Sequence, residues 1–122
     1  MIKTEKSIAL LNTTAPFASP NAKDALDIAM IMGSFEQPTY LFFAGDGVWQ
    51  LKSKQDPSKI NVKDFLKTFS AFEFYDIEDI YVCQQSLDER GLAADFHIKN
   101  VQLLSTESFS HQLKQHHTVL TF

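Results

Sequence analysis

The sequence predicts an α/β fold in three layers, with a doubly wound, mainly parallel five-stranded sheet between helices. Short apolar runs alternate with segments of helical periodicity along the whole 122-residue chain, which is typical of strand–helix–strand units. The run at residues 39–44 is apolar throughout, as expected for a parallel strand whose two faces are both covered by helices. No linker, internal repeat or low-complexity tract interrupts this alternation, so we expect a single domain over residues 1–122.

The amino-terminal part is expected to form a strand, a helix and a second strand. Residues 7–11 are a short apolar run and predict the first strand. Ser19 is a suitable N-cap and Pro20 suits the first helical position, so a helix is expected from there to about Gly33. The apolar run at 39–44 then predicts the second strand.

The middle of the chain is expected to contain a turn, a loop and a second long helix. Gly45-Asp46-Gly47 predicts a turn, and residues 48–51 begin another short segment. Residues 55–59 are polar, contain a proline and predict a loop. Asn61 is expected to cap a helix with one apolar face, formed by Val62, Phe65, Leu66, Phe69 and Phe72.

The last third predicts three more strands with two helices between them. Residues 80–83 predict the third strand, and Gly91 is expected to end the short helix that follows it. The fourth strand is expected at 96–101 and the fifth at 118–122. Ser105 is expected to cap the helix between them, whose inward side chains are Phe109 and Leu113.

One helix is apolar on nearly every side. Within residues 25–32, Asp27 is the one polar residue. A helix of this kind is buried on more than one side, so its outer side is expected to contact a partner subunit, although cover by a neighbouring loop is the alternative. The chain also contains 11 phenylalanines, more than a small core readily holds, which again favours an interface.

Composition excludes several classes of function. The formal net charge of −4 argues against direct, sequence-independent binding of nucleic acid, which needs clustered Lys and Arg. No apolar run reaches the roughly 18 residues of a membrane span. The chain has one cysteine and no recognisable export signal, so a reducing cytoplasm is the expected compartment.

Cys83 is the candidate catalytic residue, in the role of a sulfur carrier. It lies at the expected carboxyl end of a strand, the edge at which open α/β sheets place their ligand sites. If the next helix begins at Gln84, Cys83 lies at the positive end of the helix dipole, which favours a thiolate. Residues 86–89 also fit a capping box, which would start the helix later and farther from Cys83. The alternative to a reactive thiol is a small buried side chain.

The sequence indicates no cofactor and no metal. Gly45-Asp46-Gly47 lacks the spacing of the common nucleotide-binding motifs, so a tight turn is expected there, with Asp46 at the edge of the site. His111 and His116 are five residues apart, whereas two histidine ligands on one helix need a spacing of about three or four. His97 and His117 add no better spacing, and we expect surface histidines rather than ligands.

Two stretches, residues 41–51 (LFFAGDGVWQL) and 75–92 (YDIEDIYVCQQSLDERGL), resemble the DsrE/DsrF-like family. The closing residues 119–122 and the early residues 14–16 agree with this resemblance, which covers essentially the whole chain. It implies the α/β fold expected above. Within the family, Cys83 matches the cysteine at the end of the third strand.

The resemblance also implies a function and partners. It implies a cytoplasmic sulfur-relay heterohexamer with TusB-like and TusD-like subunits, which passes persulfide sulfur from a TusA-like to a TusE-like carrier toward 2-thiolation of the tRNA wobble uridine. The main carrier cysteine would lie on the TusD-like subunit, so this chain would act mainly in assembly, without turnover of its own. The alternatives are a DsrF-like role in dissimilatory sulfur oxidation and direct persulfide transfer through Cys83.

Overall fold

The structure of the protein is a computed structural model, and it describes residues 7–15, 21–35, 38–52, 69–72, 77 and 79–122. Within these residues, five strands form one sheet in the order β4-β3-β2-β1-β5. The strands are β1 (Ile8–Asn12), β2 (Thr39–Phe43), β3 (Ile80–Cys83), β4 (Val101–Leu104) and β5 (Thr118–Thr121). All four pairings between neighbouring strands are parallel, which confirms the predicted fold class.

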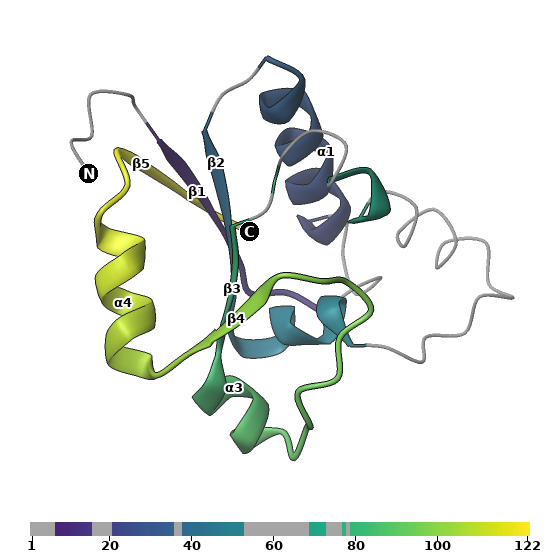
Figure 1. Ribbon diagram of the computed structural model, residues 1–122, viewed down its shortest axis with the longest axis vertical. Coiled ribbons are helices and arrows are strands. Elements are labelled where there is room, and N and C mark those ends of the chain that lie inside the picture. The colour runs from purple at the N-terminus through teal and green to yellow at the C-terminus, as the bar shows by residue number, and fades with distance from the viewer. Residues whose placement is uncertain (1–6, 16–20, 36–37, 53–68, 73–76, 78) are drawn as a thin grey trace, which may run out of the picture.

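Helices cover both faces of this sheet. They include α1 (Asn21–Ser34), the 3-10 helix η1 (Gly45–Leu51), α3 (Gln84–Glu89) and α4 (Thr106–Lys114). Residues 69–72 are also helical, in agreement with the helix predicted to carry Phe69 and Phe72. Figure 1 shows α1 and α4 on opposite sides of the strands, with α3 and η1 near the end at which β2 and β3 finish. The chain therefore places its strand-to-helix connections along one edge, the carboxyl edge of the sheet.

Side chains of the central strands alternate between two apolar clusters. On the α1 side, Leu41 and Phe43 belong to a cluster that also contains Leu26, Ala29, Phe69 and Phe72. On the α4 side, Phe42 belongs to a smaller cluster with Ala9, Tyr81, Cys83 and Phe109. The continuous apolar run of the second strand is thus explained by burial on both faces, as predicted.

The fourth strand was predicted in the wrong place. It occupies Val101–Leu104 instead of residues 96–101. Phe96 forms an isolated antiparallel bridge with Lys52, and Asn100 has a φ of 65°, which is incompatible with extended strand geometry. The segment before β4 is therefore held by contacts with the end of η1 and turns sharply into the strand.

Most of the other predicted element boundaries agree with the structure. The Ser105 hydroxyl accepts a hydrogen bond from the backbone N–H of Ser108 at 3.2 Å and caps α4, and Gly91 follows α3 with a φ of 64°. The predicted turn at 45–47 and the segment at 48–51 form one 3-10 helix. The predictions at Ser19, Pro20, 55–59 and Asn61, with Val62, Phe65 and Leu66, lie outside the described residues.

Helix α1 is buried on one side and partly exposed at its carboxyl end. Ala25, Leu26 and Ala29 are buried against the sheet, whereas 55% of Ile31 and 80% of Phe35, just after the helix, are exposed. The contact with a partner subunit therefore remains a prediction for this end of α1. Among the described residues, no helix combines the length and apolar character that crossing a membrane requires.

Candidate functional site at the carboxyl edge

Cys83 is the last residue of β3 and the N-cap of α3. Its φ of −79° and ψ of 114° are extended, and the helix begins directly at Gln84. The capping-box interpretation of residues 86–89 is therefore wrong, because Ser86 lies inside the helix. Its hydroxyl instead accepts a hydrogen bond from the backbone N–H of Gly45 at 2.9 Å. The sequence thus located Cys83 at a strand-to-helix junction, and the structure places it there.

The Cys83 side chain is packed as a small apolar residue. It is 7% exposed and belongs to the cluster with Phe42, Tyr81 and Phe109. Burial, followed by the negative charge of Asp79, raises the pKa of the Tyr81 phenol, so this neighbour stays neutral at physiological pH. Apolar burial of this kind is typical of structural rather than reactive cysteines.

Two helix starts nevertheless lie next to Cys83. Its backbone pairs with Leu104 of β4, two residues before α4 begins. The first turns of the two helices contact each other, because the Thr106 hydroxyl donates a hydrogen bond of 2.5 Å to the side-chain oxygen of Gln85. Helix amino termini favour negative charge, so this part of the edge would stabilise a thiolate or persulfide anion if the sulfur became accessible.

An ion pair fastens α3 to η1. The Nε and Nη2 atoms of Arg90 both lie 3.0 Å from Asp46 Oδ1, and Nη1 donates to the backbone oxygen of Ser86 at 3.1 Å. Asp46 is therefore at the edge of the site, as expected. Arg90 was not among the residues expected at this site. No local pattern signals this pairing, because Asp46 and Arg90 are 44 residues apart in the sequence.

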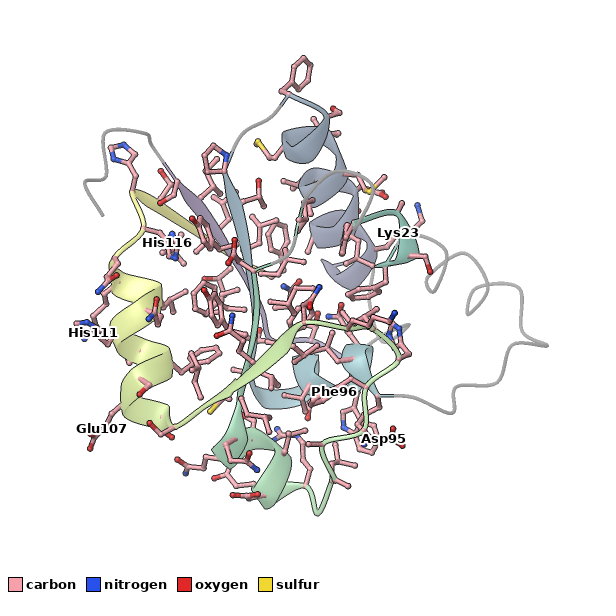
Figure 2. All side chains as sticks on the ribbon, viewed as in Figure 1. Lys23, Asp95, Phe96, Glu107, His111 and His116 are labelled. Atoms are coloured by element: carbon pink, nitrogen blue, oxygen red, sulfur yellow. The ribbon has the colours of Figure 1, made fainter. Side chains whose placement is uncertain are left out.

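The four histidines occupy separate places. The His111 Nε2 atom lies 2.8 Å from the Gln115 side-chain nitrogen, and Figure 2 shows His111 on the outer side of α4. His116 lies between the end of α4 and the strands, where its Nδ1 is 2.9 Å from the Ser7 hydroxyl. His97 and His116 are partly buried, so the expectation of surface histidines fits His111 and His117 only. Among the described residues, no three His, Cys, Asp or Glu side chains form a metal-binding group.

His97 joins the segment before β4 to η1. Its Nε2 donates to the Gln50 backbone oxygen at 2.7 Å, and its ring packs edge-on against Phe69 at a centroid distance of 5.1 Å. Burial lowers the pKa of His97 below the usual 6.5, and the hydrogen bond to Gln50 opposes this shift only in part.

The lowered pKa of His97 predicts a loss of stability in mild acid. Between the folded-state pKa and about 6.5, the unfolded chain binds more protons than the folded one, so the free energy of unfolding rises with pH across this window. The contribution is complete above about pH 6.5 and disappears as the pH falls toward the folded-state pKa. Urea unfolding should show that the free energy of unfolding of His97→Gln depends less on pH than that of wild type in this window. The matched exposed variant His111→Gln should keep the wild-type dependence, and a slope unchanged in His97→Gln would contradict the assignment.

Proteins of similar sequence identify the family of this chain. A model of the DsrE/DsrF-like family matches residues 6–122. The chain belongs to the DsrE/DsrF-like family. Two similar proteins are each named "Protein TusC homolog". The one from Aliivibrio fischeri is 30% identical over 109 residues, with 89% of this chain and 92% of that protein covered. The one from Pseudomonas aeruginosa is 32% identical over 116 residues, with 95% and 98% covered.

A solved structure supports the fold of this DsrE/DsrF-like chain. The crystal structure of the ychN protein from E. coli superposes with a TM-score of 0.75 and covers 98% of this chain and 100% of the other. The two sequences are 22% identical, so this likeness bears on the fold alone. The ychN protein thus shares the fold described above.

Proposed function

We propose that the protein is the TusC-type subunit of a cytoplasmic sulfur-relay complex. In that complex, TusB-like and TusD-like subunits would complete a heterohexamer that passes persulfide sulfur from a TusA-like to a TusE-like carrier, toward 2-thiolation of the tRNA wobble uridine. The observation that carries the proposal is the match to two TusC homologues over nearly their full lengths. The names of both relatives favour this role over a DsrF-like role in sulfur oxidation.

The geometry favours an assembly role for this subunit. Cys83 is covered by aromatic side chains, so its sulfur is poorly placed to meet a second protein. Ile31 and Phe35, in contrast, are apolar and largely exposed. Large apolar side chains that leave water on association supply much of the affinity of a stable interface. We therefore place a subunit contact at the carboxyl end of α1.

Co-expression with the TusB-like and TusD-like proteins of the same organism tests this role. The wild-type chain should co-purify with both partners, and Phe35→Ser should weaken the complex by about 2 kcal/mol, or roughly 30-fold, because an aromatic anchor is lost. Gln102→Ser, which changes an exposed side chain of β4, is the matched control and should leave the affinity unchanged. Failure of the wild-type chain to co-purify would contradict the assembly role.

Direct sulfur transfer through Cys83 is the second candidate, and the two helix starts beside Cys83 favour it. In this step the Cys83 thiolate would attack the outer sulfur of a donor persulfide, the donor S–S bond would break, and the donor thiolate would leave. The purified complex, incubated with a persulfide donor, would then contain this chain made heavier by one sulfur atom. Because the thiol is buried, we expect no such adduct in wild type and normal tRNA 2-thiolation in Cys83→Ser cells. An adduct that Cys83→Ser abolishes, together with lost thiolation, would establish the carrier role instead.

A further inference from the structure

A group of buried polar side chains lies where β1 ends, on the side of the sheet opposite Cys83. Asn12 is 1% exposed and Gln50 is 0% exposed, and Thr14 follows Asn12 in the connection after β1. Three oxygen atoms of this group have no hydrogen-bond partner among the described residues: Asn12 Oδ1, Thr14 Oγ1 and Gln50 Oε1. A buried acceptor left unpaired destabilises the folded state, so these three oxygen atoms indicate that a hydrogen-bond donor belongs there.

The orientation of both side-chain amides follows from their other contacts. The Asn12 Nδ2 group donates to the backbone oxygens of Leu10 and Phe42, each at 3.1 Å. The Gln50 Nε2 group donates to the backbone oxygen of Thr14 at 3.0 Å. Rotating either amide by half a turn would bring its oxygen against these carbonyl oxygens and lose the hydrogen bonds. The unpaired atoms of Asn12 and Gln50 are therefore the amide oxygens, which can only accept hydrogen bonds.

The backbone of η1 brings the three residues to the same place. Gly47 lies directly against the end of β1, since a Cβ atom at Gly47 would overlap the backbone carbonyl of Asn12. A 3-10 helix has three residues per turn, so Gly47 and Gln50 lie one above the other on the same face of η1. One turn of η1 thus contacts Asn12 and the next contacts Thr14. This contact therefore brings Asn12, Thr14 and Gln50 to the same region of the fold.

The chemistry of the group selects its ligand. Two amide oxygens require donors, and a hydroxyl can donate to a third atom; none of the three side chains carries a charge. A metal cation placed there would lose its hydration without gaining an anionic ligand, which is strongly unfavourable. A water molecule has two hydrogens to donate and can accept one, which matches the group, and three hydrogen bonds are typical of a buried water.

We propose that the contact between β1 and η1 is a buried water-binding site, in which one ordered water donates to Asn12 Oδ1 and Gln50 Oε1 and accepts from the Thr14 hydroxyl. The water connects the end of β1, the first strand-to-helix connection and η1, and so helps to position the residues that line this part of the carboxyl edge. The site is independent of the proposed sulfur relay, because it uses neither Cys83 nor any partner subunit.

Oxygen-17 magnetic relaxation dispersion of the purified chain tests the proposal, because it counts waters whose residence times exceed the tumbling time. Wild type should hold one more long-lived water than Gln50→Met. In this variant the Gln50 amide oxygen is lost, while the side-chain volume stays similar. Thr14→Val removes only the hydroxyl and should shorten the residence time of this water or release it. The control Gln102→Met changes an exposed glutamine of β4 and should keep the wild-type count.

Two results would overturn the proposal. If Gln50→Met does not fold, Thr14→Val decides by itself, and a count and residence time equal to those of wild type exclude the site. Urea unfolding in potassium chloride and in choline chloride of equal ionic strength distinguishes a cation. Equal stability in the two salts agrees with water. Greater stability in potassium chloride, lost in Gln50→Met, would assign the site to a cation instead.

Discussion

Gly47→Ala should lower the free energy of unfolding by about 3 kcal/mol or more, because the new methyl group has no space. A Cβ atom at this position would overlap the carbonyl carbon and oxygen of Asn12. Those atoms belong to the backbone at the end of β1, where the Asn12 carbonyl also accepts a hydrogen bond from the Ala44 N–H at 3.1 Å. A flexible side chain could move aside at little cost, but here β1 or the whole of η1 has to shift. Chemical denaturation monitored by circular dichroism measures the effect.

A second glycine separates this overlap from backbone strain. Gly91 has a φ of 64°, and a Cβ atom there would meet no atom within 4 Å. Gly91→Ala should therefore cost only the left-handed strain of a residue with a side chain, about 1–2 kcal/mol. An equal loss in the free energy of unfolding for Gly47→Ala and Gly91→Ala would contradict the close approach of η1 to β1. A loss of stability in Gly47→Ala should also be accompanied by a change in the fluorescence of Trp49, which lies in η1.

The central part of the fold could be predicted because its signals are local. The apolar run containing Leu41, Phe42 and Phe43 needs cover on both faces in any α/β arrangement, and the N-cap preference of Ser105 depends on the few residues that follow it. The fourth strand was misplaced because residues 96–99 alternate between apolar and polar side chains as a strand does. Their true conformation depends on contacts with η1 far away in the sequence, such as the hydrogen bond from the His97 N–H to the Leu51 carbonyl.

The candidate site was predictable in position but not in environment. The order of a strand, Cys83 and a helix places the thiol at the carboxyl edge, and the structure agrees. It is buried in a cluster that includes Phe109, and Phe109 belongs to α4, which follows β4 in the chain. Likewise, neither Arg90 nor Asp46 carries a local signal for their pairing, because the ion pair forms only after α3 packs against η1. Tertiary packing, which no short motif encodes, decides whether the cysteine is reactive or structural.

Phe109→Ala tests this packing, and it should lower the free energy of unfolding by about 3–5 kcal/mol. Phe109 is buried and packs edge-on against Phe42, with ring centroids 5.3 Å apart, in the cluster that covers Cys83. Removing the ring leaves a cavity between α4 and the sheet, and the helix should open more often. Because a buried thiol reacts mainly from opened states, alkylation of Cys83 should become faster on the order of 100-fold. Timed reaction with a thiol reagent under native conditions, followed by mass spectrometry, measures the rate.

The exposed Phe35 provides the matched control for the same chemical change. It is 80% exposed, so Phe35→Ala should change the free energy of unfolding of the isolated chain by no more than about 0.5 kcal/mol and leave the alkylation of Cys83 unchanged. If Cys83 of the wild-type chain already reacts as fast as a small free thiol, the aromatic cover does not protect it. The helix starts at Gln84 and Thr106 would then outweigh the apolar cover, and direct sulfur transfer through Cys83 would become the better interpretation of this site.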